Sequence, residues 1–155
     1  MLSHQQISKR FLDYFIKHEK FKHKLLVSAS LIPEEYDPSA LFISAGMHPL
    51  KPYLFGLKKP LSKRLCSIQK CFRTTDIDEV GLKDTKLTFF FMLGNWSIND
   101  YWKKEAIEMA YDLLVSEFKI SVERLQFSIF KGSKDIPKDT EAKKIWISLG
   151  VKEDK

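Results

Sequence analysis

The chain has 155 residues and a net charge of +6, with 44% hydrophobic and 13% aromatic residues. This apolar content excludes a disordered chain, and the length is enough to bury a hydrophobic core. We therefore expect a single domain over residues 1–155, without an internal linker. The positive charge is compatible with a polyanionic partner such as RNA or a nucleotide, although lysine-rich surfaces also serve solubility alone.

The sequence carries no membrane or export signal. No run approaches the roughly eighteen uncharged apolar residues that a membrane-spanning helix needs, and the N-terminus lacks the apolar stretch of a signal peptide. We therefore expect a cytoplasmic protein without a membrane contact. Two cysteines, Cys66 and Cys71, are too few for a disulfide framework or a zinc cage, and we expect reduced packing residues.

The first predicted element is an amphipathic helix near the N-terminus. Ser3 with Gln6 three residues later is typical of a capping box, and the apolar residues that follow lie on one helical stripe. These residues are Ile7, Phe11, Leu12, Phe15 and Ile16. Three histidines, His4, His18 and His23, share no metal-binding spacing and are expected at the surface.

Three segments of different character follow the first helix. Residues 27–33 are predicted to be extended, and residues 40–44 are rich in β-forming side chains and predict a strand that ends at small residues. The proline-bearing segment 48–60 predicts a loop or a short irregular helix.

The centre of the chain predicts an antiparallel hairpin. Residues 64–73 alternate as a strand, residues 74–81 form an acidic turn, and residues 87–93 return as a second strand that Gly94 ends.

Two helices and one further strand complete the predicted elements. A helix covers residues 101–118, residues 125–130 alternate as a strand, and a last helix begins at Asp139 or Thr140 and ends at Gly150. This order predicts an α+β fold in which helices back an antiparallel sheet.

Chemistry is suggested first by Arg73, which ends a predicted central strand opposite a strand of phenylalanines. A guanidinium can hold phosphate oxygens by two parallel hydrogen bonds, and a phenyl face can stack on a base. The alternative is an exposed arginine beside an aromatic core strand. None of the common dinucleotide, P-loop, zinc-protease or nucleophile-elbow motifs occurs.

Five segments carry a pattern that is specific in its order along the chain. They are Leu41-Phe-Ile-Ser-Ala-Gly-Met47, Gln69-Lys-Cys-Phe-Arg73, Val80-Gly81, Thr88-Phe-Phe-Phe-Met-Leu-Gly-Asn-Trp-Ser97 and Asp100-Tyr-Trp-Lys-Lys-Glu-Ala-Ile107. Together they resemble the N-terminal part of the alanyl-tRNA synthetases. The similarity extends over residues 7–118.

This resemblance implies a class II synthetase fold that activates alanine with ATP and Mg²⁺ and transfers it to tRNA-Ala. It implies that Arg73 is the catalytic residue, which binds the α-phosphate of ATP. It also implies that Phe90, or its neighbour Phe89, stacks on the adenine, with Met92 and Lys86 at the same ATP site. Strand alternation places Phe90 and Met92 on one face and Phe89 on the other, which favours Phe90. No residue is assigned as a metal ligand.

The amino-acid site is implied only at Met47, because the family builds the rest of its alanine pocket from later residues. The chain stops at Lys155, before that pocket and before the third sequence motif of the class. The resemblance therefore implies an N-terminal fragment of a catalytic domain, which we expect to be inactive in isolation. The alternative is a synthetase-like remnant or paralogue that is not catalytic and binds tRNA or a protein partner.

The chain also departs from the family next to the expected nucleotide site. The family commonly has Arg-His-His where this chain has Thr85-Lys86-Leu87, and it has Glu where this chain has Phe91. Lys86 is a candidate replacement for a phosphate-binding cation.

Overall fold

The computed structural model describes residues 2–34, 37–75 and 77–152. The chain forms two compact units, residues 1–98 and residues 99–155. Two compact units can belong to one domain, so the single domain over residues 1–155 stays a prediction. Asp76, which belongs to the predicted acidic turn, lies outside the described residues.

The first helix, α1 (His4–Lys17), has the predicted amphipathic character. The Ser3 hydroxyl accepts a hydrogen bond from the Gln6 backbone N–H, and the Gln6 side chain accepts one from the Ser3 backbone N–H, at 3.2 and 2.8 Å. The predicted capping box is therefore confirmed. Phe11 and Phe15, on the apolar stripe, are buried.

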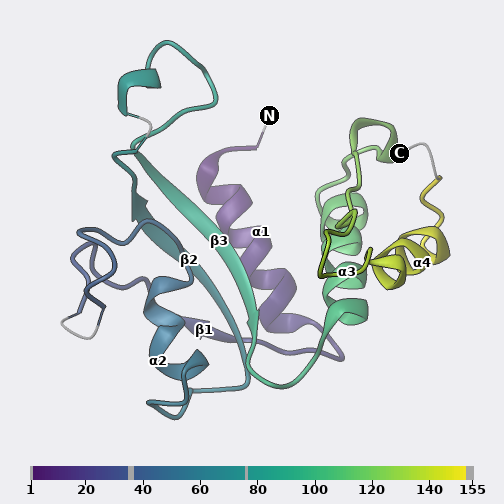
Figure 1. Cartoon of the computed structure of the whole chain (residues 1–155), viewed down its shortest axis with the longest axis horizontal. Coiled ribbons are helices and arrows are strands. Elements are labelled where there is room, and N and C mark those ends of the chain that lie inside the picture. Colours follow the sequence, from purple (N-terminus) through teal and green to yellow (C-terminus); the bar gives the residue numbers. More distant parts are fainter. Residues whose placement is uncertain (1, 35–36, 76, 153–155) are drawn as a thin grey trace. The chain divides into compact units, whose positions relative to one another are not determined.

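A three-stranded sheet lies beside α1 in the first unit (Figure 1). Its strands are β1 (Lys24–Leu26), β2 (Arg64–Phe72) and β3 (Phe89–Ser97), in this spatial order. β2 and β3 pair in antiparallel fashion, which confirms the predicted hairpin. β1 pairs with β2 in parallel, so the sheet is mixed rather than wholly antiparallel. The long connection between β1 and β2 provides the crossover that a parallel pair requires. The predicted α+β class is confirmed.

Different segments contact the two faces of β3. Phe90 and Met92 share one face, where the Gly46 backbone N–H donates to the Met92 sulfur at 3.1 Å. Phe91 points to the opposite face, where its ring centroid lies 5.1 Å from that of His4 in α1. One face of the hairpin is therefore covered by α1, and the other receives the chain segment that follows residue 40.

The strand predicted over residues 40–44 is wrong, although all five residues are described. The Ile43 carbonyl accepts from the Phe72 N–H and the Ile43 N–H donates to the Leu31 carbonyl, both at 2.8 Å. Ile43 thus makes one backbone hydrogen bond to Leu31 and one to the end of β2. The neighbouring residues do not repeat these bonds, so no strand forms. The next segment is irregular as predicted, with a 3₁₀ turn at His48–Leu50 and the short helix α2 (Lys51–Leu54).

The strand predicted over residues 125–130 is also wrong, because these residues pair with no described strand. Their burial still alternates along the chain. The ring of Phe127 lies 4.7 Å from the ring of Trp146, so a helix covers the apolar side of this extended segment.

β3 continues past the glycine that was predicted to end it. Gly94 pairs with Ser67 inside the antiparallel ladder. A Cβ atom on Gly94 would lie 2.5 Å from Cζ2 of Trp96, so the indole ring occupies the space above this glycine. The absence of a side chain here makes room for the indole and does not end the strand.

Two predictions about titratable side chains have different outcomes. Cys66 and Cys71 are free and buried, as predicted, and burial raises the pKa of the Cys66 thiol to about 11. The surface position predicted for His23 is wrong, because this ring is buried and lies 4.9 Å from the ring of Phe15. Burial lowers the pKa of His23.

The second unit contains the helices α3 (Lys103–Asp112) and α4 (Thr140–Ser148). α3 begins two residues later than predicted and continues as a π-helical turn over Leu113–Glu117. α4 begins as predicted, because the Asp139 carboxylate caps it by accepting from the Ala142 N–H at 3.0 Å. Among the helices that the structure describes, none combines the length and the apolar character needed to cross a membrane.

Candidate functional site

Arg73 directly follows β2 and lies at the end of the hairpin where the connecting loop begins. Its backbone N–H donates to the carbonyl of Thr88 at 2.8 Å, which holds it beside the start of β3. The guanidinium carbon lies 5.1 Å from the centroid of the Phe90 ring, in the range of a cation–π contact. The hairpin thus brings together the arginine and the aromatic ring that were predicted to share a site.

Arg73 and Phe90 line a pocket of about 520 Å³, together with Thr85, Lys86 and Leu87. This volume falls in the range of small-molecule sites, which is roughly 300–1,000 Å³. The lining combines an aromatic ring with two cationic side chains, and it includes no carboxylate among the described residues. Such a pocket favours a ligand with both an anionic part and an aromatic part.

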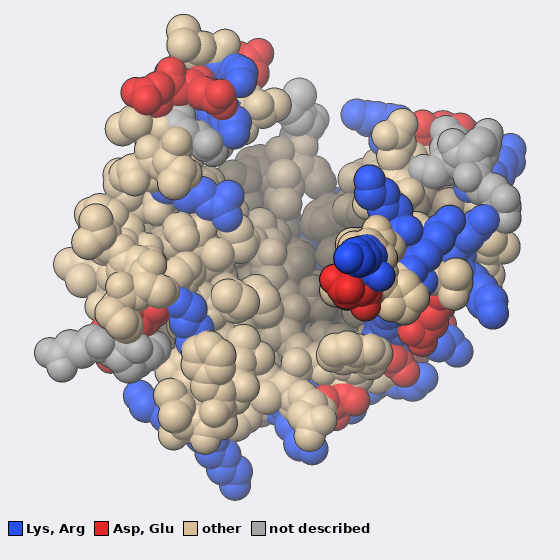
Figure 2. Space-filling model, in the orientation of Figure 1, with Lys and Arg blue, Asp and Glu red and all other residues tan. Residues whose placement is uncertain are grey.

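The loop between β2 and β3 carries ion pairs that limit what Lys86 can contribute. One Glu79 carboxylate oxygen lies 2.7 Å from the Lys83 ammonium, and the other lies 3.5 Å from the Lys86 ammonium. Figure 2 shows acidic and basic side chains side by side on this loop. The charge of Lys86 is therefore partly balanced by Glu79, which makes Arg73 the stronger candidate for binding an anion.

Three of the predicted site residues do not line this pocket. Phe89 is 44% exposed, and its ring packs against the Phe91 ring, with the centroids 5.4 Å apart. Met92 contacts the Gly46 backbone through its sulfur, and Met47 is an exposed residue of the same segment. The roles assigned to Phe89, Met92 and Met47, like those of the pocket residues, stay predictions.

The replacement of the family's Glu by Phe91 falls on the face of β3 away from this pocket. The Phe91 ring lies beside His4, whereas the pocket is lined by Phe90 on the other face. The departure at Phe91 therefore leaves the lining of the Arg73 pocket unchanged.

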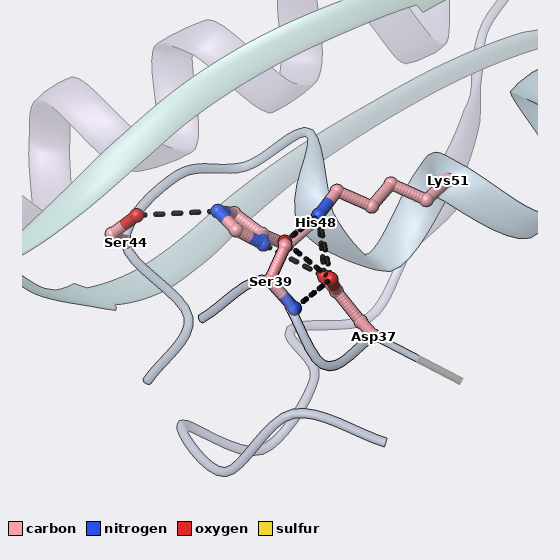
Figure 3. Close-up of polar contacts among 5 residues, drawn as sticks. All are labelled: Asp37, Ser39, Ser44, His48 and Lys51. Carbon is pink, nitrogen blue, oxygen red and sulfur yellow. Dashed lines mark hydrogen bonds and ion pairs between the residues drawn. The ribbon is translucent and has the colours of Figure 1, made fainter. Parts of the chain in front are cut away.

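Sequence reasoning missed a buried polar network around Asp37 (Figure 3). The Asp37 side chain is 4% exposed, and the Lys51 ammonium lies 2.7 Å from both of its oxygens. The Ser39 hydroxyl donates to the same carboxylate at 2.5 Å. The Lys51 ammonium and, next, the Ser39 hydroxyl hold the pKa of Asp37 well below its usual range. Asp37 is therefore a buried anion that its neighbours stabilise.

The network extends from Asp37 to Arg73. Nδ1 of His48 lies 2.9 Å from the Asp37 carboxylate, and Nε2 of the same ring lies 3.2 Å from the Ser44 hydroxyl. The Ser44 carbonyl accepts a hydrogen bond from Nε of Arg73 at 2.9 Å. The sequence signal for this network is the pair His48 and Lys51, which lie three residues apart at a short helical turn. Asp37, which contacts both, lies in an earlier segment of the chain, so a local sequence pattern does not reveal the contact.

Residues 6–155 match the protein family described as tRNA synthetases class II (A). The chain belongs to this family. The match covers almost the whole chain and includes the hairpin that carries Arg73 and Phe90. Membership of the class II (A) synthetases confirms the resemblance that the sequence motifs indicated.

Similar proteins are named alanine–tRNA ligases. The chain is 45% identical to that of Treponema denticola over 152 residues, which cover 97% of this chain and 24% of the relative. It is 46% identical to the Rubrobacter xylanophilus protein over 150 residues, which cover 97% of this chain and 16% of the relative. It is 45% identical to the Acholeplasma laidlawii protein over 155 residues, which cover 99% of this chain and 17% of the relative. The class II synthetase chain described here thus spans a quarter or less of these relatives.

Proposed function

We propose that this chain is the N-terminal, ATP-binding part of an alanine–tRNA ligase. The observation that carries the proposal is the pocket in which Arg73 and Phe90 lie 5.1 Å apart, guanidinium carbon to ring centroid. A guanidinium suits a phosphate group and a phenyl ring suits a base, so the pair matches the two ends of a nucleotide. The choice of alanine and tRNA-Ala as the other substrates rests on the names of the relatives.

The proposed reaction has two steps. In the first, a carboxylate oxygen of alanine forms a bond to the α-phosphorus of ATP, and pyrophosphate leaves with the electrons of the broken P–O bond. Negative charge spreads over the α-phosphoryl oxygens in the transition state, where the fixed guanidinium of Arg73 stabilises it. In the second step the oxygen of a tRNA-Ala hydroxyl forms a bond to the alanyl carbonyl carbon, the bond from that carbon to the phosphate oxygen breaks, AMP leaves, and the hydroxyl proton is released.

The residues of this pocket do not fit a protein-held Mg²⁺ ion. Mg²⁺ prefers carboxylate and other oxygen ligands, and the described lining offers two cations, two apolar side chains and Thr85. Mg²⁺ would therefore reach the site bound to the phosphates of ATP. Cytoplasmic location also stays a prediction.

The experiment is alanine-dependent exchange of labelled pyrophosphate into ATP, measured on the full-length protein that contains this chain. We expect exchange with alanine that exceeds exchange with glycine or serine. Exchange that does not depend on any amino acid would contradict the proposal. If exchange is absent while labelled tRNA-Ala is still retained on a filter, the alternative of a tRNA-binding protein without catalysis is supported instead.

A further inference from the structure

The orientation of the Arg73 guanidinium depends on one hydrogen bond to the neighbouring segment. Arg73 is exposed, and its Nε–H donates to the Ser44 carbonyl at 2.9 Å. An arginine side chain has many rotamers in water, so a fixed acceptor at Nε restricts the direction in which the remaining guanidinium donors point. The position of the Ser44 carbonyl therefore affects how Arg73 can meet a phosphate.

Ser44 is held by its side chain and by the backbone beside it. Its hydroxyl lies 3.2 Å from Nε2 of His48. The preceding residue, Ile43, makes one backbone hydrogen bond on each side, to Leu31 and to Phe72. The backbone bonds locate the segment, and the hydroxyl contact controls the local orientation of Ser44 itself.

His48 is oriented in turn by the buried carboxylate of Asp37. Its Nδ1 lies 2.9 Å from an Asp37 oxygen; a carboxylate oxygen accepts, so Nδ1 donates here, and Nε2 on the other side of the ring faces the Ser44 hydroxyl. Asp37 cannot turn away, because Lys51 contacts both of its oxygens and Ser39 contacts one. Figure 3 shows the His48 ring between Ser44 and Asp37.

We propose that Asp37, His48 and Ser44 form a relay of hydrogen bonds that positions Arg73 for the phosphate contact. The proposal rests on the proposed function, because it assigns these residues to the alanine-activating site. His48 and Ser44 are positioning residues: neither lines the pocket of Arg73 and Phe90, and both act through the Arg73 guanidinium.

The order Ser44, His48, Asp37 is also that of a hydrolytic triad. The Ser44 hydroxyl, however, lines neither the Arg73 pocket nor the neighbouring pocket that contains His48 and Asp37. The carboxylate is moreover engaged by Lys51 at 2.7 Å. The arrangement therefore supports positioning rather than nucleophilic attack by Ser44.

The test is a double-mutant cycle on the full-length protein. His48→Ala is made alone and together with Arg73→Ala, and alanine-dependent pyrophosphate exchange is measured with the folded fraction determined by circular dichroism. We expect His48→Ala alone to lower kcat about 10-fold, with a smaller change of KM for ATP, because a displaced catalytic group loses orientation. In the Arg73→Ala background we expect His48→Ala to lower kcat by less than a further factor of about 2, because the guanidinium that the relay positions is absent.

Losses from His48→Ala that are equal in both backgrounds would overturn the relay, since His48 would then act independently of Arg73. An Arg73→Ala protein with unchanged exchange would instead overturn the proposed function, so the two failures are distinguishable. His4→Ala, at an exposed histidine of the same unit, serves as the matched control and should leave exchange unchanged.

Ser44 provides a second variant pair in case His48→Ala does not fold. Ser44→Ala removes only the hydroxyl, and we expect it to lower kcat about 3-fold or more, whereas Ser44→Thr keeps a hydroxyl and should restore most of the activity. A folded Ser44→Ala protein with wild-type kcat would show that the hydroxyl does not position Arg73.

Discussion

Arg73 combines a permanent charge with a restrained direction. An arginine side chain carries a positive charge and a planar set of five N–H donors, and in Arg73 the Nε donor is bonded to the Ser44 carbonyl. Phe90 lies across from it on the next strand. The two side chains thus support the nucleotide site through different interactions, so their contributions can be separated by mutation.

Phe90 and Phe89 make a matched pair for testing adenine stacking. Phe90 lines the pocket, whereas Phe89 packs on Phe91 at the opposite face. Because stacking of a base on an aromatic ring contributes roughly 1–3 kcal/mol, we expect Phe90→Ala to raise KM for ATP about 10-fold in the full-length protein. Phe89→Ala should change KM for ATP less than about 2-fold. An equal rise of KM for ATP in both variants would contradict the proposal that adenine stacks on the Phe90 face of β3 and not on the Phe89 face.

Asp37 makes stability depend on pH in acid. Its pKa in the folded protein lies below the ordinary value, so the folded state binds fewer protons than the unfolded state and stability rises with pH. This contribution is complete above the ordinary Asp pKa of about 3.9 and is lost as the pH falls below it. We expect Asp37→Asn to lower the free energy of unfolding on the order of 3 kcal/mol at pH 7, measured by urea unfolding, with a smaller difference near pH 2.

Asp13 is the control for this prediction, because its carboxylate is 39% exposed and pairs with Lys9 and Lys17 of its own helix. Asp13→Asn should lower the stability much less at pH 7. A difference between wild type and Asp37→Asn that stays constant down to pH 2 would show that the Asp37 charge is not the source of the stability.

At the scale of elements, β3 and the segment after residue 40 meet around one indole ring. Cζ2 of Trp96 would lie 2.5 Å from a Cβ on Gly94 and 3.0 Å from a Cβ on Gly46. The Trp96 indole N–H donates to the Ser67 hydroxyl at 3.1 Å, which fixes the ring across β2. Two glycines therefore allow the indole to fill the space between the hairpin and the segment that carries Ser44.

Gly94→Ala tests this packing. The new methyl group would overlap the Trp96 ring, and overpacking of this kind costs about 1–3 kcal/mol of unfolding free energy. We expect this loss in urea unfolding, and we expect it to shrink in a Trp96→Leu background, where the ring is absent. If Gly94→Ala lowers the unfolding free energy equally in both backgrounds, the loss comes from the backbone of β3 and not from overlap with the Trp96 ring.

The sequence predicted where α1 and α4 begin, because each of these helix starts has a local cause. The capping box at Ser3 and the Asp139 cap are interactions between residues a few positions apart, and both are present. Residues 125–130 have the alternation of a strand, but a strand also needs a partner, which the pattern cannot report. The prediction that Gly94 ends the strand is wrong because the glycine has another role. The indole ring of Trp96, on the same strand, occupies the space where a side chain of residue 94 would lie.

At the scale of the molecule, the candidate site was only partly predictable. Sequence motifs located Arg73 and Phe90, since the resemblance marks both strands of the hairpin. The support behind Arg73 was not predicted, because Asp37 meets Lys51 only after the intervening chain folds back. A buried carboxylate in a turn-rich segment has the same sequence appearance as an exposed one, and only its folded environment distinguishes them.

All residues of the candidate site belong to the first compact unit, residues 1–98. The chain spans 24% of the Treponema denticola relative, and Met47 is the one residue of this chain that is predicted to belong to the alanine pocket of the proposed ligase. To the proposed ATP site this chain contributes one arginine, one aromatic ring and the network that holds the arginine.

The most direct test of this account is pyrophosphate exchange by the full-length protein carrying Arg73→Ala. We expect alanine-dependent exchange to fall about 100-fold or more, the scale of losing one charge contact in the transition state. Arg73→Lys should recover little, because an ammonium cannot form two parallel hydrogen bonds. Arg10→Ala, at an exposed arginine of α1, is the matched control and should leave exchange unchanged. A folded Arg73→Ala protein with wild-type exchange would contradict the assignment of Arg73 to the ATP site.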